Sequence, residues 1–192
     1  MTTRAELLVA SHAELRTRMA NGHPIEASRL DDTRYRGISL GLPAWVERLT
    51  WKKFTKAFHR DPRAGNLRGW NVRIEKDGLD RPWRARVRKG EPWTFGHFEV
   101  IADHDRLLLD YGAGGNGRLD PLRMLRDPLV ALHPGSVELL LGWSYLAIGP
   151  AKIPTPSYFL LEREGPLESP AANPGGRVRY RSTSCTGSSP LS

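Results

Sequence analysis

The chain has 192 residues, of which 39% are hydrophobic, and it contains six Trp, five Tyr and five Phe. This length is typical of one folded domain with its own core, and no run approaches the about 20 consecutive apolar residues of a membrane span. The single cysteine, Cys185, excludes an intramolecular disulfide and a multi-cysteine metal site, and we expect no metal and no cofactor.

The chain is strongly basic, with a formal net charge of +8. Such a charge fits an anionic ligand or a nucleic acid as partner, or a solvated arginine-rich surface. The sequence contains no zinc finger, helix-turn-helix or RNA-binding motif, so nucleic acid is not the expected partner.

The first twenty residues carry a helix-start signal. Thr3 and Glu6 have the spacing of a capping box, in which each side chain bonds the backbone N–H of the other residue. We therefore expect a helix to about Ala20, ended by Asn21-Gly22. The segment lacks the apolar centre of a secretory signal, which favours a cytoplasmic location.

A short strand is expected at residues 32–40, followed by a second helix near residues 43–58. Pro43 suits the first position of a helix, where its missing N–H is not needed. Apolar residues from Trp45 to Phe58 recur on one side of that helix, and three lysines, Lys56 among them, fall on the solvent side.

From Trp70 to Arg163, apolar and polar residues alternate in short runs broken by Gly, Pro and Asp. This alternation is typical of antiparallel strands with one buried face and one solvent face. The sequence therefore predicts a mainly β domain over residues 1–164, a small antiparallel barrel or roll with helices against it. Residues 165–192 are rich in Ser, Pro, Gly and Arg without apolar periodicity, and we expect a disordered tail.

Two motif matches bear on catalysis and cofactor binding. Residues 37–41 match the G-x-S-x-G nucleophile elbow, but that motif needs parallel strands with crossover helices, and this sequence predicts hairpins. Residues 112–117 match G-x-G-x-x-G, but no helix is expected to begin there to hold a pyrophosphate. We interpret the first as a strand-end turn and the second as a hairpin loop.

The aromatic residues of the predicted strands are the candidate ligand-binding residues. A ligand would meet them as the walls of a barrel cavity, with His97 as the polar group that orients it; the alternative is that they fill the core. Arg84 and Arg86 lie on one strand face, which predicts either a solvated outer face or a site for a carboxylate or phosphate. The wall residues are Trp70, Trp83, Trp93, Phe95, Trp143 and Tyr145.

Two stretches carry a resemblance to a known family. Residues 32–37 (DTRYRG) lead through 41–43 (GLP) to 49–54 (LTWKKF), with Tyr35 in place of a Trp and Thr33 in place of a glycine. Residues 158–163 (YFLLER) form a matching terminal strand. Together they resemble the GXWXG-type domain and the companion domain that often follows it. The resemblance implies a lipocalin-like closed sheet of the calycin type and no assigned activity.

The function predicted first is binding of a small apolar or amphipathic ligand, lipid-like or aromatic, in a barrel cavity. One alternative is a small enzyme in the same cavity, with His97 and either Glu99 or Asp110 as acid and base. A second alternative is an anion or nucleic-acid binding module. The sequence does not favour an enzyme, identifies no catalytic residue, and leaves the oligomeric state open.

Overall fold

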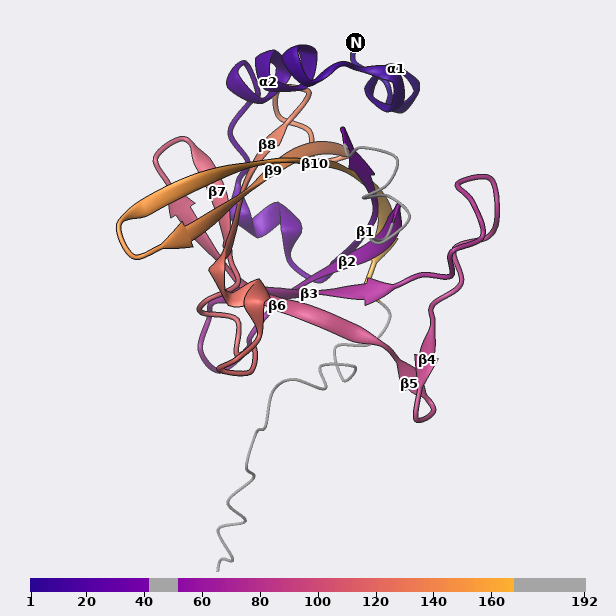
Figure 1. The fold of residues 1–192 in the computed structure, drawn as a ribbon, viewed down its shortest axis with the longest axis vertical. Helices are drawn as coiled ribbons and strands as arrows, with labels where there is room; N and C mark the ends of the chain where they lie inside the picture. Colours follow the sequence, from indigo (N-terminus) through magenta and orange to yellow (C-terminus); the bar gives the residue numbers. More distant parts are fainter. Residues whose placement is uncertain (42–51, 168–192) are drawn as a thin grey trace, which may run out of the picture.

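The computed structural model of the chain describes residues 1–41 and 52–167. Eight antiparallel strands form a closed barrel in the order β1-β10-β9-β8-β7-β6-β3-β2 (Figure 1). This confirms the prediction of a mainly β protein built on an antiparallel barrel. The strands are β1 (Thr33–Leu40), β2 (Lys53–Arg60), β3 (Leu67–Arg73), β6 (Thr94–Asp103), β7 (Arg106–Asp110), β8 (Leu125–Ala131), β9 (Leu139–Ile148) and β10 (Ala151–Pro166).

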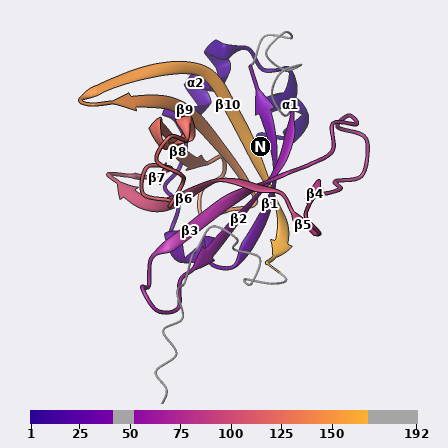
Figure 2. The same ribbon diagram turned by 60° about the horizontal axis from the view of Figure 1, so that its bottom comes forward.

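Between β3 and β6 the chain leaves the barrel and returns. This excursion carries a small hairpin of β4 (Val87–Arg88) and β5 (Glu91–Pro92), which projects beside the barrel (Figure 2). At the other end of the sequence β10 continues to Pro166, and residues 168–192 of the predicted tail lie outside the described residues. No helix in the described ranges has the length and apolar character needed to cross a membrane.

The expected N-terminal helix is present as two short helices, α1 (Arg4–Val9) and α2 (His12–Ala20). The predicted capping box of Thr3 and Glu6 is confirmed, and Ser11 and Glu14 form a second one that starts α2. Because Ser11 takes up a cap conformation, the helix is interrupted there. Both helices pack on the outer face of the barrel through Leu7, Leu15, Met19, Leu139, Leu141 and Leu160.

The second helix expected near residues 43–58 is wrong over Lys53–Phe58, which belong to β2; residues 42–51 lie outside the described residues. Phe54 and Phe58 are four positions apart, a spacing that fits both a helix and alternate positions of a strand. In the strand, Lys56 lies between them on the same face and is turned into the barrel. The lysine assigned to solvent is therefore among the most buried side chains of the protein.

The barrel interior holds the larger of two hydrophobic clusters. At one end Ile25 and Leu30 join this cluster, and the 3-10 helix η1 (Ala27–Leu30) lies across the ring of strands in Figure 1. The tyrosine at the start of β1, Tyr35, packs edge-on against Phe58 and donates a hydrogen bond to the Val137 carbonyl (3.0 Å). This end of the barrel is therefore filled with side chains.

Three cross-strand pairs of glycine and phenylalanine narrow the interior. Gly37 faces Phe54, Gly69 faces Phe98, and Gly142 faces Phe159, each pair in register on neighbouring strands. A Cβ on any of these glycines would lie within 2.3 Å of the opposite ring, so each ring occupies the space above a bare backbone. Each ring therefore lies over the neighbouring strand and fills interior space next to it.

Candidate ligand site inside the barrel

A cavity of about 170 Å³ lies inside the barrel at the end opposite η1. Its lining comes from the end of β1, the start of β2, the end of β3 and the starts of β6 and β8, together with β9, β10 and η2 (Pro121–Met124). These strand ends meet because the neighbours are antiparallel. The lining residues are Ser39, Phe54, Lys56, Asn71, Phe95, Tyr111, Leu122, Leu125, Asp127, Ser144, Ser157 and Phe159.

A buried polar cluster of Lys56, Tyr111 and Asp127 forms one wall of this cavity. Lys56 Nζ donates to the Tyr111 hydroxyl (2.9 Å), which in turn donates to Asp127 Oδ2 (2.8 Å). The direct separation of Lys56 Nζ and Asp127 Oδ2 is 3.9 Å. Lys56 is 1% exposed and Asp127 3% exposed, so the pair is shielded from bulk water. Tyr111 therefore bridges two oppositely charged groups in a low-dielectric interior.

Aromatic rings surround the Lys56 ammonium group on its other sides. Its Nζ lies 4.6 Å from the ring centroid of Phe98, 5.0 Å from that of Phe159 and 5.7 Å from that of Phe54. The negative ring faces attract a cation that has lost its water. The same glycine-facing phenylalanines that narrow the barrel thus hold the lysine head in place.

Burial shifts the pKa values of all three polar groups. Desolvation lowers the pKa of Lys56 to about 8, and the charge of Asp127 opposes this shift. Desolvation raises the pKa of Asp127, and here the charge of Lys56 opposes it. The pKa of the Tyr111 hydroxyl is raised well above its usual range by burial and by the neighbouring carboxylate. Lys56 therefore loses its proton more readily than it would in water. Asp127 and Tyr111 hold their protons more tightly than they would in water.

One acceptor in the cluster is unused. Asp127 Oδ1 is buried and accepts no hydrogen bond of normal geometry among the described residues, although the nearby Ser144 hydroxyl acts to lower the pKa of Asp127. Such an atom costs about 1–3 kcal/mol when it is left unpaired. Asn71, which also lines the cavity, is already committed to the carbonyl of Gly96 (3.0 Å). An incoming donor would satisfy the Asp127 oxygen.

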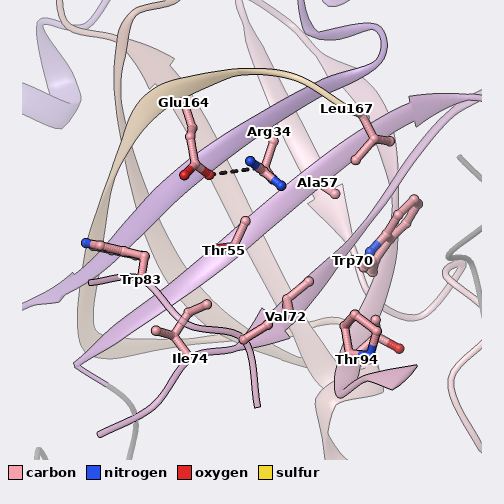
Figure 3. Close-up of a pocket in the computed structure, with 12 residues that line it drawn as sticks. Arg34, Thr55, Ala57, Trp70, Val72, Ile74, Trp83, Thr94, Glu164 and Leu167 are labelled. Atoms are coloured by element: carbon pink, nitrogen blue, oxygen red, sulfur yellow. Dashed lines mark ion pairs between the residues drawn. The ribbon is translucent and has the colours of Figure 1, made fainter. Parts of the chain in front are cut away.

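The structure separates the predicted wall residues into several places, and of the seven residues named for the ligand only Phe95 lines the barrel cavity. Trp70 and Trp83 line a different groove of about 260 Å³, on the outer face of β1, β2 and β3 beneath the β3–β6 excursion (Figure 3). The ion pair of Arg34 and Glu164 (2.8 Å) lies across the same groove.

Trp93 lies among arginines on the β3–β6 excursion. The Arg73 guanidinium stacks on its ring at 3.8 Å, with Arg86 at 5.7 Å and Arg88 at 5.2 Å. Burial and the charges of Arg86 and Arg88 lower the pKa of Arg73. Of the two arginines predicted to bind an anion, Arg86 also pairs with Glu75 (3.7 Å), and Arg84 is exposed.

Trp143 and Tyr145 face outward from β9, in contact with each other. Trp143 lines a groove between α2 and the β9–β10 hairpin and donates from Nε1 to the Thr155 carbonyl (2.9 Å). The prediction that these two residues share one strand face holds. That face is the outside of the barrel, where α1 and α2 pack.

A β-bulge turns His97 away from the cavity. The pairing of β3 with β6 gains one residue on β6, next to Gly96 with its φ of 53°. Phe95 lines the cavity and Phe98 lies in the interior core, so simple alternation fails between them. Burial lowers the pKa of His97. Within the described ranges no hydrogen bond joins His97 to Glu99 or Asp110, which pair instead with Arg68 (3.6 Å) and Arg126 (3.1 Å).

The glycine-rich loop of residues 112–117 closes onto β6. Asn116 bonds the backbone N–H and carbonyl of His97 (2.9 and 2.6 Å) and the Tyr111 carbonyl (2.7 Å). Gly114 lies so close that a Cβ there would fall 1.9 Å from the His97 carbonyl oxygen. The glycines serve this close contact, and no helix begins in the loop to bind a phosphate.

The G-x-S-x-G match also has a structural explanation. Its serine, Ser39, lies within β1 and faces the cavity, and Gly37 gives room to Phe54. Across residues 1–41 and 52–167 no group of three His, Cys, Asp or Glu side chains could hold a metal ion. Sequence reasoning missed Lys56, Tyr111 and Asp127, and the one signal for them was a lysine at the centre of a Phe-x-Lys-x-Phe alternation.

A comparison with protein-family models finds no family that matches this chain, and a comparison with curated proteins finds no relative. The geometry of the barrel is therefore the basis for the functional argument.

Proposed function

We propose that the barrel binds a small amphipathic ligand in the cavity next to Lys56. The apolar part of the ligand packs against Phe54, Phe95 and Phe159, and its polar end meets Lys56 and Asp127. Binding removes apolar ligand surface from water, worth roughly 25 cal/mol for each Å² buried before the costs of association.

The observation that carries this proposal is a buried ion pair that lines a cavity. Replacing a buried ion pair by apolar residues of similar size is often neutral or stabilising, so stability alone gives little reason for Lys56 and Asp127. Both face a cavity with otherwise mostly apolar walls and a few small hydroxyl and amide groups. A few polar groups converging in an apolar cavity are typical of small-molecule sites.

The volume limits the size of the ligand. An apolar cavity of about 150 Å³ holds a benzene molecule, and this one measures about 170 Å³. The group that enters the barrel is therefore a single ring or a short chain. A longer ligand would extend past Leu122 and Leu125 at the rim.

The test is titration with benzyl alcohol, a single ring with one hydroxyl, followed by calorimetry and ligand-observed NMR. Leu122→Trp narrows the rim and should weaken binding by about tenfold or more, because a displaced ring loses its buried contacts. Leu119→Trp, at a position 98% exposed nearby in the chain, is the matched control and should bind like the wild type. No saturable binding, or equal binding by both variants, would refute the proposal.

The GXWXG resemblance remains a proposal beside this one, since it implies a barrel and supplies no ligand. The enzymatic alternative built on His97 loses its support because His97 does not line the cavity.

A further inference from the structure

We propose that Lys56 condenses with the carbonyl group of a small aldehyde or ketone, so that the barrel holds this ligand as a reversible imine. This inference rests on the proposed function, because the carbonyl compound must first occupy the cavity. It adds the chemical class of the ligand and a covalent step.

The surroundings of Lys56 Nζ favour attack on a carbonyl carbon. Lys56 lines the cavity, its nitrogen donates one hydrogen bond to Tyr111 and lies 3.9 Å from Asp127, and the ring centroids of Phe98 and Phe159 are 4.6 and 5.0 Å away. A lysine desolvated in a hydrophobic pocket is an activated nucleophile, since burial disfavours its ammonium form. With a pKa of about 8, on the order of a tenth of Lys56 is neutral at pH 7, against roughly one in 2,500 for an ordinary lysine.

The neighbouring groups supply the proton transfers. Lys56 gives a proton through the Tyr111 hydroxyl to Asp127, the path set by the hydrogen bonds of 2.9 and 2.8 Å. The nitrogen lone pair then forms the C–N bond as the C=O π bond opens, and one N–H proton passes to the oxygen, which becomes the hydroxyl of the carbinolamine. The C–O bond breaks next, the hydroxyl leaves as water with a proton returned by the cluster, and the imine remains. Aldehyde plus amine gives imine plus water, with no oxidant or reductant.

Charge balance favours a carbonyl over a carboxylate as the ligand group. Asp127 already compensates Lys56 at 3.9 Å, so a carboxylate would bring an unmatched negative charge into a buried site. A neutral carbonyl brings none. Once the imine is protonated, Asp127 serves as its counter-ion, as it did for the ammonium.

Lys53 is the natural comparison within the same strand. It is also buried, at 3% exposed, but its Nζ is bonded to the Asp77 carboxylate and to the Gly78 carbonyl (2.7 Å). It does not line the barrel cavity. Its nitrogen is saturated with acceptors, and we expect no condensation there.

The experiment treats the intact protein with benzaldehyde and sodium cyanoborohydride near neutral pH, then maps the benzylated peptides by mass spectrometry. Labelling should concentrate on Lys56, at least about tenfold faster than on surface lysines, because more of its amine is free. Lys56→Arg should lose this fast label and Lys53→Arg should keep it. If Lys56→Arg fails to fold by circular dichroism, the peptide map of the wild type decides.

Benzyl alcohol separates the two proposals, because it occupies the cavity but cannot condense. If benzyl alcohol binds and benzaldehyde leaves no preferential label on Lys56, the imine proposal is overturned and ligand binding stands. If neither compound binds, both proposals fall. Labelling spread evenly over Lys53 and the surface lysines also overturns the imine.

Discussion

Burial shifts the pKa values of the two charged groups in the cavity, Lys56 and Asp127, in opposite directions. Both shifts lower the stability of the folded state at neutral pH. The pKa of Lys56 falls because its ammonium has lost water, and that of Asp127 rises because its carboxylate has lost water. Their mutual attraction recovers part of this loss.

The lowered pKa of Lys56 predicts that the protein becomes more stable at alkaline pH. Between the folded pKa of Lys56, about 8, and its unfolded value of about 10.4, the unfolded chain binds more protons, so the free energy of unfolding rises with pH. We expect a rise of about 2 kcal/mol from Lys56 by about pH 9.5, where the tyrosines of the unfolded chain are still mostly protonated.

Urea unfolding at about pH 7.5 and about pH 9.5 checks this prediction. Lys56→Met should remove the rise, because the titrating group is gone. Lys152→Met, at an exposed position on β10, should leave it unchanged. An equal rise in both variants would contradict a buried, desolvated Lys56.

At the scale of elements, several strands of this barrel are ambiguous for one physical reason: both of their faces are covered. The interior faces one cluster, while α1, α2 and the β3–β6 excursion cover much of the outside. Alternation therefore identified strands such as β3, β6 and β9, but it did not reveal which of their faces points inward. Trp70 and Trp143 belong to covered outer faces, and Asn71 faces the cavity.

The sequence did not predict the bulge at Gly96 or the strand at Lys53–Arg60. A bulge changes the parity of all later side chains in its strand, and a single glycine is a weak sign of it. In β2 the spacing of Phe54 and Phe58 fits both periods, and the long-range pairing with β1 and β3 decides for the strand.

Helix α2 contributes stability through its contact with the barrel, because nine residues make a marginal helix in water. Leu15→Ala should lower the free energy of unfolding by about 2–5 kcal/mol, the range for a fully buried leucine. Leu8→Ala, at a position 38% exposed on α1, should cost much less. Thermal and urea unfolding of the two variants measure the difference. Equal losses would argue against α2 packing as a stabilising element.

For the molecule as a whole, the glycine–phenylalanine pairs limit the free space inside the barrel. They narrow the interior of an eight-stranded barrel around the ring-sized cavity described above. The sequence predicted the barrel and its antiparallel pairing, but the cavity depends on which distant strands bring Gly and Phe together. That pairing is a property of the closed sheet, so the position of the site could not be read from local patterns.

Enlarging the cavity should change which of two ligands, a larger or a smaller aromatic alcohol, binds more tightly. Phe54→Leu removes part of a lining ring, so 2-naphthalenemethanol should gain affinity relative to benzyl alcohol, at a stability loss of about 1–2 kcal/mol. Phe58→Leu alters a ring that packs against Tyr35 at the filled end of the barrel and does not line the cavity, and should leave the preference unchanged. Calorimetric titration of both alcohols measures the ratio. The same shift in both variants would contradict this cavity as the binding site.

The barrel closes between β1 and β10, which are its first and last strands in sequence order. Thr33 pairs with Pro166, and Arg4 in α1 reaches Glu162 of β10 (3.1 Å). During translation, β1 and β9 therefore leave the ribosome with an edge whose partner has not yet been made. Closure has to follow release of residues up to 166, and these distant contacts make folding slow. A nascent chain stalled before that point would expose two unprotected strand edges to its neighbours on the polysome.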